Sequence, residues 1–436
     1  MTTSEAPRPA SKGSIGLVSA TALGVGGMMG AGLYTLLGLA TTSTGTWLPL
    51  AFLVAGVAAA FSVYSYSKLG ATFPSRGGAA EFLRRSFGEG EVAGGLNVFQ
   101  YVGYLIATSL YAAGFAEYVR ALAGDALPSW GGKAVGAGVV VLFALVNLVG
   151  SSVVGRAESV IVGIETVILL GFVVLGLFKA DPSRLTSQGS PALGGVVTGA
   201  ALLYVTYQGF GVVANASGEM AQPRKELPRA MFAALGIVAA VYLVVSTLVV
   251  MLLPLTTIEA DAGHALADAG EAVAGRAGFV VVAAAAILAT ASAVNATIFA
   301  ASSIASDVAT HHELPGRLDG TVGRRKAPVA LLFSAVAVIA LVLFFPLSAV
   351  GQMTSLAFLV VYGAVSLGHL RVRAQTGAAA WPLLLAVVLN TLLFVALLVD
   401  AIRTGPPATW VTLLVALVGS FVAEQLLRRR RTGRTA

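Results

Sequence analysis

The sequence predicts an all-α integral membrane protein with twelve transmembrane helices. Its 436 residues are 57% hydrophobic and only 11% charged, whereas soluble proteins carry about 25% charged residues. Apolar segments follow one another along almost the whole chain, and a bilayer crossing needs roughly 20 such residues. Lysine and arginine gather in alternate connections between these segments. Together these observations exclude a soluble fold.

Short polar or glycine-rich connections separate the twelve predicted helices. The first helix is too long and too rich in glycine to be the apolar part of a cleavable signal peptide, so we expect it to stay in the mature protein. The two longest inner connections, 72–91 and 309–327, contain short amphipathic pieces. The predicted helices cover approximately residues 15–41, 46–71, 92–122, 134–152, 158–179, 193–217, 229–254, 276–308, 328–347, 350–370, 380–402 and 408–427.

The basic residues predict the orientation in the membrane. With the N-terminus inside, 21 of the 27 lysine and arginine residues fall on the inner side, as the positive-inside rule requires. Both termini are therefore predicted to be cytoplasmic, in a multi-pass protein of the cell (plasma) membrane. The basic tail contributes part of the net charge of +7. We expect it to anchor the chain near anionic lipid, so no nucleic-acid partner is expected.

Glycine interrupts two of the predicted helices near their centres. GVGGMMGAG, residues 24–32, lies in the first helix and YQGFGVVANASGE, residues 207–219, in the sixth. Because the interruptions recur five helices apart and five is odd, the second set of five helices enters the bilayer from the opposite side. That is the pattern of an inverted repeat with paired broken helices. The predicted parts are a cytoplasmic tail 1–12, a first five-helix repeat 13–180, an inverted second repeat 191–373, accessory helices 11 and 12 in 380–427, and a basic cytoplasmic tail 428–436.

These glycines have two possible explanations, close packing and a ligand site. Close helix packing explains one glycine-rich helix, and Gly26 and Gly30 have the spacing of a small-xxx-small contact. The second interruption favours a ligand site, since unwound backbone in hydrocarbon costs several kcal/mol for each unbound N–H or C=O group. Half-helix N-termini attract a carboxylate, and C-terminal carbonyl ends attract an ammonium group or a cation. Paired interruptions therefore suit a zwitterion such as an amino acid.

Four segments carry a family resemblance: GVGGMMGAGLY, NLVGSSVVGRAESV, YQGFGVVANASGEMAQPRKELPRAM and AVNATIFAASSIASDVATHHELP. Through them the chain resembles the amino acid–polyamine–organocation (APC) superfamily of secondary transporters, in its proton-coupled amino-acid transporter-like branch. The resemblance covers essentially all twelve helices. It implies the LeuT-type 5+5 inverted repeat with broken helices 1 and 6 and two accessory helices. It also implies transport of an amino acid by alternating access.

The resemblance places a substrate site between the two interruptions. The N–H groups around Gly30, Ala31 and Gly32 are expected to bind the substrate carboxylate, and carbonyls of both broken helices the ammonium group. Family members that handle cationic amino acids can carry a glutamate at the position of Gly211, so the glycine favours a neutral substrate. The full predicted set is Gly26, Met29, Gly30, Ala31, Gly32, Tyr207, Gln208, Gly209, Phe210 and Gly211.

Two side chains in this set have open roles. Gln208 stands where relatives are usually apolar, and it hydrogen-bonds either the substrate or only the broken backbone. Val205 stands where some relatives carry an aromatic residue that gates the site. Phe210 either takes over that gating role or simply packs in the core.

Glu165 is the predicted coupling residue. It lies about two turns into the fifth helix with apolar residues on both sides, and ionisable residues in mid-membrane are expensive and usually functional. Proton-coupled relatives commonly carry a lysine here, so the sign of the charge is inverted. Beside helix 1 carbonyls near Gly26 and the Ser292 hydroxyl, the carboxylate is expected to take up a proton, with a sodium ion as the alternative. A purely structural glutamate is the third possibility.

No feature of the sequence indicates an enzyme. It has no Walker A motif, no histidine pair at zinc spacing and no nucleophile with a credible base, and with no cysteine it has no thiolate metal site. We therefore expect no cofactor beyond the coupling ion, no obligate protein partner, and a lipid bilayer and a small amino acid as the partners. The alternatives are a carrier of another small amine, such as a polyamine or an ethanolamine-like compound, and a transport-inactive sensor or scaffold.

Overall fold

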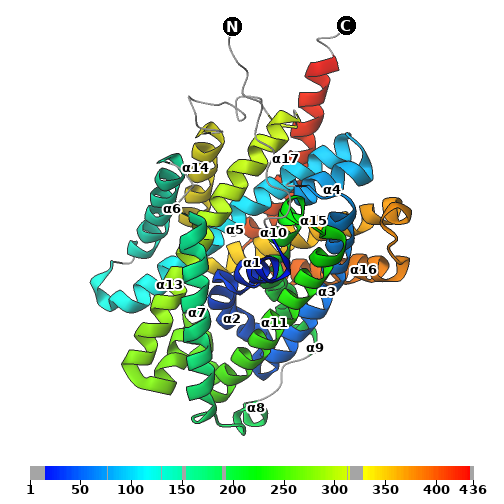
Figure 1. The fold of residues 1–436 in the computed structure, drawn as a ribbon. Helices are drawn as coiled ribbons and strands as arrows, with labels where there is room; N and C mark the ends of the chain where they lie inside the picture. The colour runs from blue at the N-terminus through cyan, green and yellow to red at the C-terminus, as the bar shows by residue number, and fades with distance from the viewer. Residues whose placement is uncertain are drawn as a thin grey trace, which may run out of the picture.

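The computed structural model describes residues 15–75, 77–128, 130–149, 154–188, 193–311, 313–314 and 328–432. Within these ranges the regular structure is helical, and the β structure is limited to an isolated bridge between Ile15 and Met220. Figure 1 shows the helices packed as one bundle, with α4 and the end of α17 at one end and α8 at the other. The predicted all-α class is confirmed.

The helices have the following bounds: α1 Leu17–Met29, α2 Ala31–Thr44, α3 Leu48–Thr72, α4 Gly78–Phe87, α5 Glu91–Ala123, α6 Gly131–Val149, α7 Val154–Leu177, α8 Arg184–Ser187, α9 Leu193–Leu203, α10 Phe210–Asn215, α11 Pro223–Leu252, α12 Leu255–Ala260, α13 Ala265–Thr310, α14 Pro328–Phe344, α15 Leu347–Thr376, α16 Ala380–Thr404 and α17 Pro407–Thr432. Short 3₁₀ turns complete them: η1 Gly45–Trp47, η2 Gly124–Ala126, η3 Tyr204–Tyr207 and η4 Ala216–Glu219.

Ten helical stretches in the described ranges are long and apolar enough to cross a membrane. The first, 17–72, takes in two predicted helices, and α14 is a shorter apolar helix, which accounts for the difference from twelve. Side chains such as Val160, Val167 and Leu170 on α7 are more than half exposed. Apolar faces of this kind match lipid rather than water, so the chain is an integral membrane protein. The count of twelve and the inverted repeat remain predictions.

Both glycine-rich segments interrupt their helices. Gly30, between α1 and α2, has φ −57° and ψ −145°, and that ψ is far from the helical value. In the second segment α9 ends at Leu203, the 3₁₀ turn η3 follows, and α10 begins at Phe210. The interruptions therefore occur where the glycines predict them.

Two predicted helix starts differ from the structure by six residues or more. The sequence predicts helix 7 from residue 229, but α11 begins at Pro223, because proline fits the first turn of a helix, where its missing N–H costs nothing. It predicts helix 8 from residue 276, but α13 is helical from Ala265, with a kink at Ala274 and Gly275. Gly275 has φ +64°, a left-handed conformation that glycine adopts without strain.

The broken helix α1–α2 lies inside the bundle. α1 packs against α7 and α11, and α2 packs against α5, α9 and α13. Long contacts between α5 and α13 and between α3 and α11 form the surrounding frame. Small residues allow this close packing: a Cβ at Gly24 would meet the Ala234 Cβ at 2.7 Å.

Candidate substrate site

The second interruption crosses the last turn of α1 at a glycine-to-glycine contact. A Cβ added to Gly209 would lie 2.1 Å from the Gly27 carbonyl carbon and 2.4 Å from the Met28 nitrogen. These are backbone atoms, so neither segment can yield to a side chain. Close packing therefore explains Gly27 and Gly209, and it holds the second interruption beside the end of α1, just before the break at Gly30.

Beyond the crossing, the start of α2 faces the second broken helix. A Cβ at Gly32 would lie 3.1 Å from the Thr206 Cα, and Met29 and Ala31 are buried. Gly30 is less crowded, since a Cβ there would meet only the Gly26 carbonyl oxygen at 3.6 Å. No side chain caps α2, so the amides of its first turn are available to an anion.

Tyrosine hydroxyls already satisfy several carbonyls of the interruptions. The Tyr242 hydroxyl, on α11, donates to the carbonyl oxygens of Met28 and Thr206, which belong to the two different broken helices. The Tyr362 hydroxyl, on α15, donates to the Gln208 carbonyl oxygen at 3.2 Å. We expected a ligand to satisfy the unwound backbone, but these tyrosine hydroxyls already bind part of it. A tyrosine within an apolar helix gives no sequence signal that distinguishes it from core.

Gln208 contacts a neighbouring side chain rather than the broken backbone. Its Nε2 donates to the Tyr111 hydroxyl on α5 at 2.9 Å, and its Oε1 is buried with no hydrogen-bond partner. The hydroxyls of Tyr34 and Tyr66 are also buried without a partner. Of the two roles predicted for Gln208, a hydrogen bond with the broken backbone is not formed by its side chain among the described residues. Its Oε1 remains available to bind a substrate.

Phe210 lies in a packed aromatic group on one side of the crossing. Its ring centroid is 4.9 Å from that of Tyr362 and 5.2 Å from that of Tyr66. Tyr362 also contacts Phe358 at 5.6 Å, so α3, α10 and α15 share the group. Phe210 is fully buried here, which fits the packing role.

Gly211 and Tyr207 lie on different sides of the second broken helix. A Cβ at Gly211 would have no atom within 4 Å, so this position has room for a larger side chain. Tyr207 is fully buried, and its hydroxyl donates to the Phe52 carbonyl oxygen on α3 at 3.0 Å. Tyr207 thus anchors the segment to the frame.

Glu165 is buried on α7, with 2% of its surface exposed. α1 packs one turn away, since a Cβ at Gly26 would meet Val162 Cγ2 at 3.0 Å. Glu165 is close enough to Tyr34 and Tyr242 for electrostatic interaction with both. It therefore faces the residues that border the two interruptions.

Ser292 is half-buried on α13, which packs against α7. In the described part of the chain no hydrogen bond joins it to Glu165, so the predicted pairing of these two residues is not formed in this conformation.

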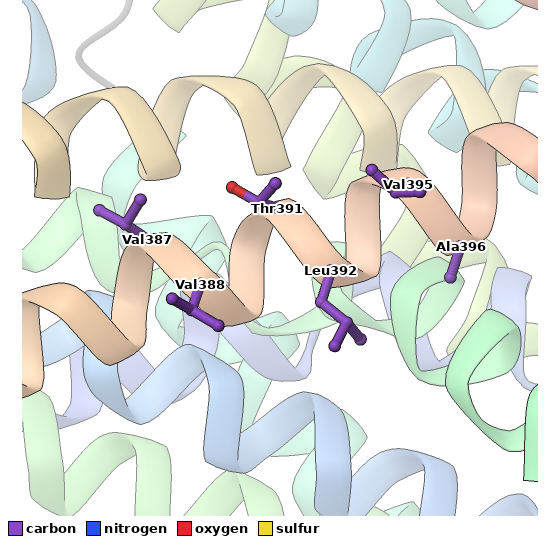
Figure 2. A pocket seen from close by; sticks show the side chains of 6 residues that line it. All are labelled: Val387, Val388, Thr391, Leu392, Val395 and Ala396. Carbon is purple, nitrogen blue, oxygen red and sulfur yellow. The ribbon is translucent and has the colours of Figure 1, made fainter.

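One surface hollow lies away from the interruptions and is apolar. Its lining comes from α16 alone: Val387, Val388, Thr391, Leu392, Val395 and Ala396. Figure 2 shows these side chains spread along the helix, and Val388, Leu392 and Val395 are at least half exposed. An apolar face of this kind suits lipid acyl chains rather than a zwitterion.

Comparison with known proteins identifies the family. Residues 15–423 match the model of the amino acid permease family. An uncharacterized protein of Methanocaldococcus jannaschii is 30% identical over 81% of this chain and 82% of its own. The inner membrane transport protein YbaT of Escherichia coli is 28% identical over 96% of this chain and 97% of its own. The mouse cationic amino acid transporter 4 is 29% identical over 56% of this chain and 42% of its own. The chain therefore belongs to the amino acid permease family, within the APC superfamily, and is a transport protein of the membrane.

Proposed function

We propose that this protein is a proton-coupled permease that moves a neutral amino acid across the plasma membrane by alternating access, with both termini cytoplasmic. The substrate lies between the two interrupted helices, as in a LeuT-type inverted repeat of twelve helices. The N–H groups of Gly30, Ala31 and Gly32 bind its carboxylate. The carbonyls of Gly26, Met29 and Tyr207 bind its ammonium group. The Gln208 carbonyl does not, because it already accepts from the Tyr362 hydroxyl and the Gly211 N–H.

The observation that carries the proposal is the close approach of the second interruption to both sides of the first: Gly209 packs on Gly27 at the end of α1, and Gly32 at the start of α2 packs on Thr206. It places an uncapped helix N-terminus beside the carbonyl end of a second broken helix. A positive and a negative dipole end then lie within the span of one zwitterion.

The side chain of the substrate is proposed to lie toward Gly211 and Gln208. Gly211 supplies space, and the free Oε1 of Gln208 supplies a hydrogen-bond acceptor. No carboxylate stands at Gly211 to pair with a second cationic group, so a neutral amino acid is favoured. The name of the mouse relative favours a cationic amino acid instead, and the two possibilities need a direct test.

A thermal-shift screen of the purified protein separates them, because a ligand that binds only the native state raises the unfolding temperature. The twenty amino acids and common polyamines are the ligands. We expect a neutral amino acid to give the largest shift, and Gly211→Glu to reduce that shift. A largest shift with arginine, lysine or a polyamine would overturn the neutral assignment.

Glu165 is proposed to carry the coupled proton. Glu165→Gln resembles the protonated acid permanently, so proteoliposomes with the variant should exchange substrate but not accumulate it under an imposed proton gradient. Glu259→Gln, at an exposed carboxyl on α12, is the control and should accumulate normally. Accumulation that requires a sodium gradient in the wild-type protein would assign Glu165 to sodium. If Glu165→Gln accumulates substrate under a proton gradient as well as the wild-type protein does, Glu165 does not carry the proton and has a structural role.

A further inference from the structure

Three metal-ligating side chains meet away from the interruptions, where the connection after α12 enters α13. Asp261, His264 and Asp268 each offer one ligand atom, and these atoms all lie within 4.8 Å of one another. His264 Nε2 is 3.7 Å from Asp261 Oδ1 and 3.8 Å from Asp268 Oδ2. This group lies in the connection 256–275, which the charge distribution places on the outer face.

The backbone holds the three residues in this arrangement. The His264 N–H donates to the Asp261 carbonyl oxygen at 2.9 Å, and the Asp268 N–H donates to the His264 carbonyl oxygen at 3.4 Å. Asp261 follows α12, His264 immediately precedes α13 and Asp268 lies in its first turn. The group is therefore built into the turn that joins the two helices.

Hydrogen bonds within the group do not satisfy its ligand atoms. Both imidazole-to-carboxylate distances are too long for hydrogen bonds, and Asp268 Oδ2 is buried with no hydrogen-bond partner. An imidazole nitrogen is a common metal ligand, and a buried oxygen without a partner costs free energy.

These ligands suit zinc. Imidazole nitrogen and carboxylate oxygen bind Zn²⁺ at about 2.0–2.2 Å in a tetrahedron, so ligand atoms there are roughly 3.3–3.5 Å apart. The two imidazole-to-carboxylate separations exceed this by a few tenths of an ångström, and the two carboxylate oxygens lie within 4.8 Å of each other, so side-chain rotations can bring the three atoms to this spacing. Magnesium and calcium prefer all-oxygen sites. We propose that Asp261, His264 and Asp268 form a zinc site, with water as the fourth ligand.

The site borders the moving parts of the proposed transporter. A Cβ at Gly38, on α2, would lie 2.3 Å from the Ala262 carbonyl oxygen, and one at Gly263 would lie 3.0 Å from Glu117 Cγ on α5. The connection is thus wedged between the half-helix that follows Gly30 and the frame. Bound zinc fixes the connection there and slows transport, a consequence that rests on the proposed function.

Calorimetric titration of zinc chloride into the full chain in detergent tests the binding. The protein carries no histidine tag and is treated first with a chelator. We expect about one zinc per chain, and at least a tenfold loss of affinity in Asp261→Asn, His264→Gln and Asp268→Asn. His311→Gln, at an exposed histidine 3.7 Å from Asp307 but outside the group, should leave the affinity unchanged.

Asp261 is half-exposed in its side chain, so Asp261→Asn keeps the test valid if either other variant fails to fold. No saturable zinc binding, or equal affinity in wild type and Asp261→Asn, would overturn the site. Saturable calcium binding of equal strength would overturn its assignment to zinc.

Proteoliposome uptake tests the consequence separately. Zinc added outside should slow uptake by the wild-type protein and not by Asp261→Asn. Zinc binding without an effect on measurable uptake would overturn the restraint on transport. Absence of uptake in every variant without zinc would instead overturn the proposed function and leave the binding result standing.

Discussion

Glycine at residue 209 and glycine at residue 211 have opposite surroundings, although only one residue separates them. A Cβ at Gly209 would overlap the backbone of Gly27, whereas a Cβ at Gly211 would have no neighbour within 4 Å. Overpacking of this kind typically costs about 1–3 kcal/mol, and glycine to alanine in a helix gains up to about 1 kcal/mol. We expect Gly209→Ala to lower the unfolding temperature in detergent and Gly211→Ala to hold or raise it.

The same two variants also separate packing from ligand binding. Gly209→Ala should weaken substrate binding, because it forces the two interruptions apart. Equal unfolding temperatures for the two variants would show that the interruptions do not cross as closely as the structure has them.

At the scale of the element, one hydroxyl connects both broken helices to α11. Tyr242 reaches Met28 and Thr206, while Tyr207 reaches only Phe52 on α3. Each hydroxyl is buried, so loss of either is expected to cost about 1–3 kcal/mol of stability. Only Tyr242→Phe releases carbonyls of both interruptions, so it should weaken substrate binding in a thermal-shift titration more than Tyr207→Phe does. A similar loss of affinity in both variants would contradict this role of Tyr242.

The end of the bundle at which α4 lies contains a second polar group, which joins α4, α5 and the end of α13. Arg84 pairs with Asp307 at 2.8 Å and lies 3.8 Å from Glu313, and the Asn97 amide donates to Glu313 at 3.0 Å. Burial raises the pKa of Glu313 above 4.5, the main effect, and Asp307 raises it too, while Asn97, Arg84 and His311 act in the opposite direction.

This shift predicts a pH dependence of stability. Because the folded pKa is raised, the contribution of Glu313 to stability is complete below about pH 4.5 and is lost as the pH rises through the raised value. Glu313→Gln cannot ionise, so its stability relative to wild type should improve from pH 4.5 toward neutral pH. Thermal unfolding of both proteins in detergent over this range measures the difference. A difference that stays constant with pH would contradict the shifted pKa.

At the scale of the whole molecule, composition and glycine position predicted the membrane class and both helix interruptions. They did so because hydrophobic length and helix breaking are local properties of the chain. The partners of the interruptions were not predictable in this way: Tyr242, Tyr362 and Tyr111 come from apolar stretches of their helices. The His264 group was missed because its connection looks like an ordinary polar loop, and only the turn between α12 and α13 aligns its ligands.

The proposed alternating access requires the connection between α12 and α13 to move against the frame, and the absence of cysteine makes that requirement testable. A Cβ at Gly263 would lie 3.3 Å from the Glu117 Cβ, close to the roughly 3.5–4.5 Å of a disulfide. We expect the double variant Glu117→Cys with Gly263→Cys to crosslink on oxidation and to lose most uptake into proteoliposomes. Reduction should restore uptake, and the two single variants, which cannot form the bond, should transport equally well under both conditions.

The crosslink acts only on motion of the connection, since neither residue belongs to the proposed substrate site. Substrate exchange and net uptake should therefore both stop in the oxidised protein, because each requires the site to open to the outer face. Mass spectrometry confirms the disulfide. If the crosslinked protein then transports as fast as the same protein after reduction of the disulfide, the substrate does not pass beneath this connection. The route between α2, α5 and the start of α13 would then be excluded as the outer pathway.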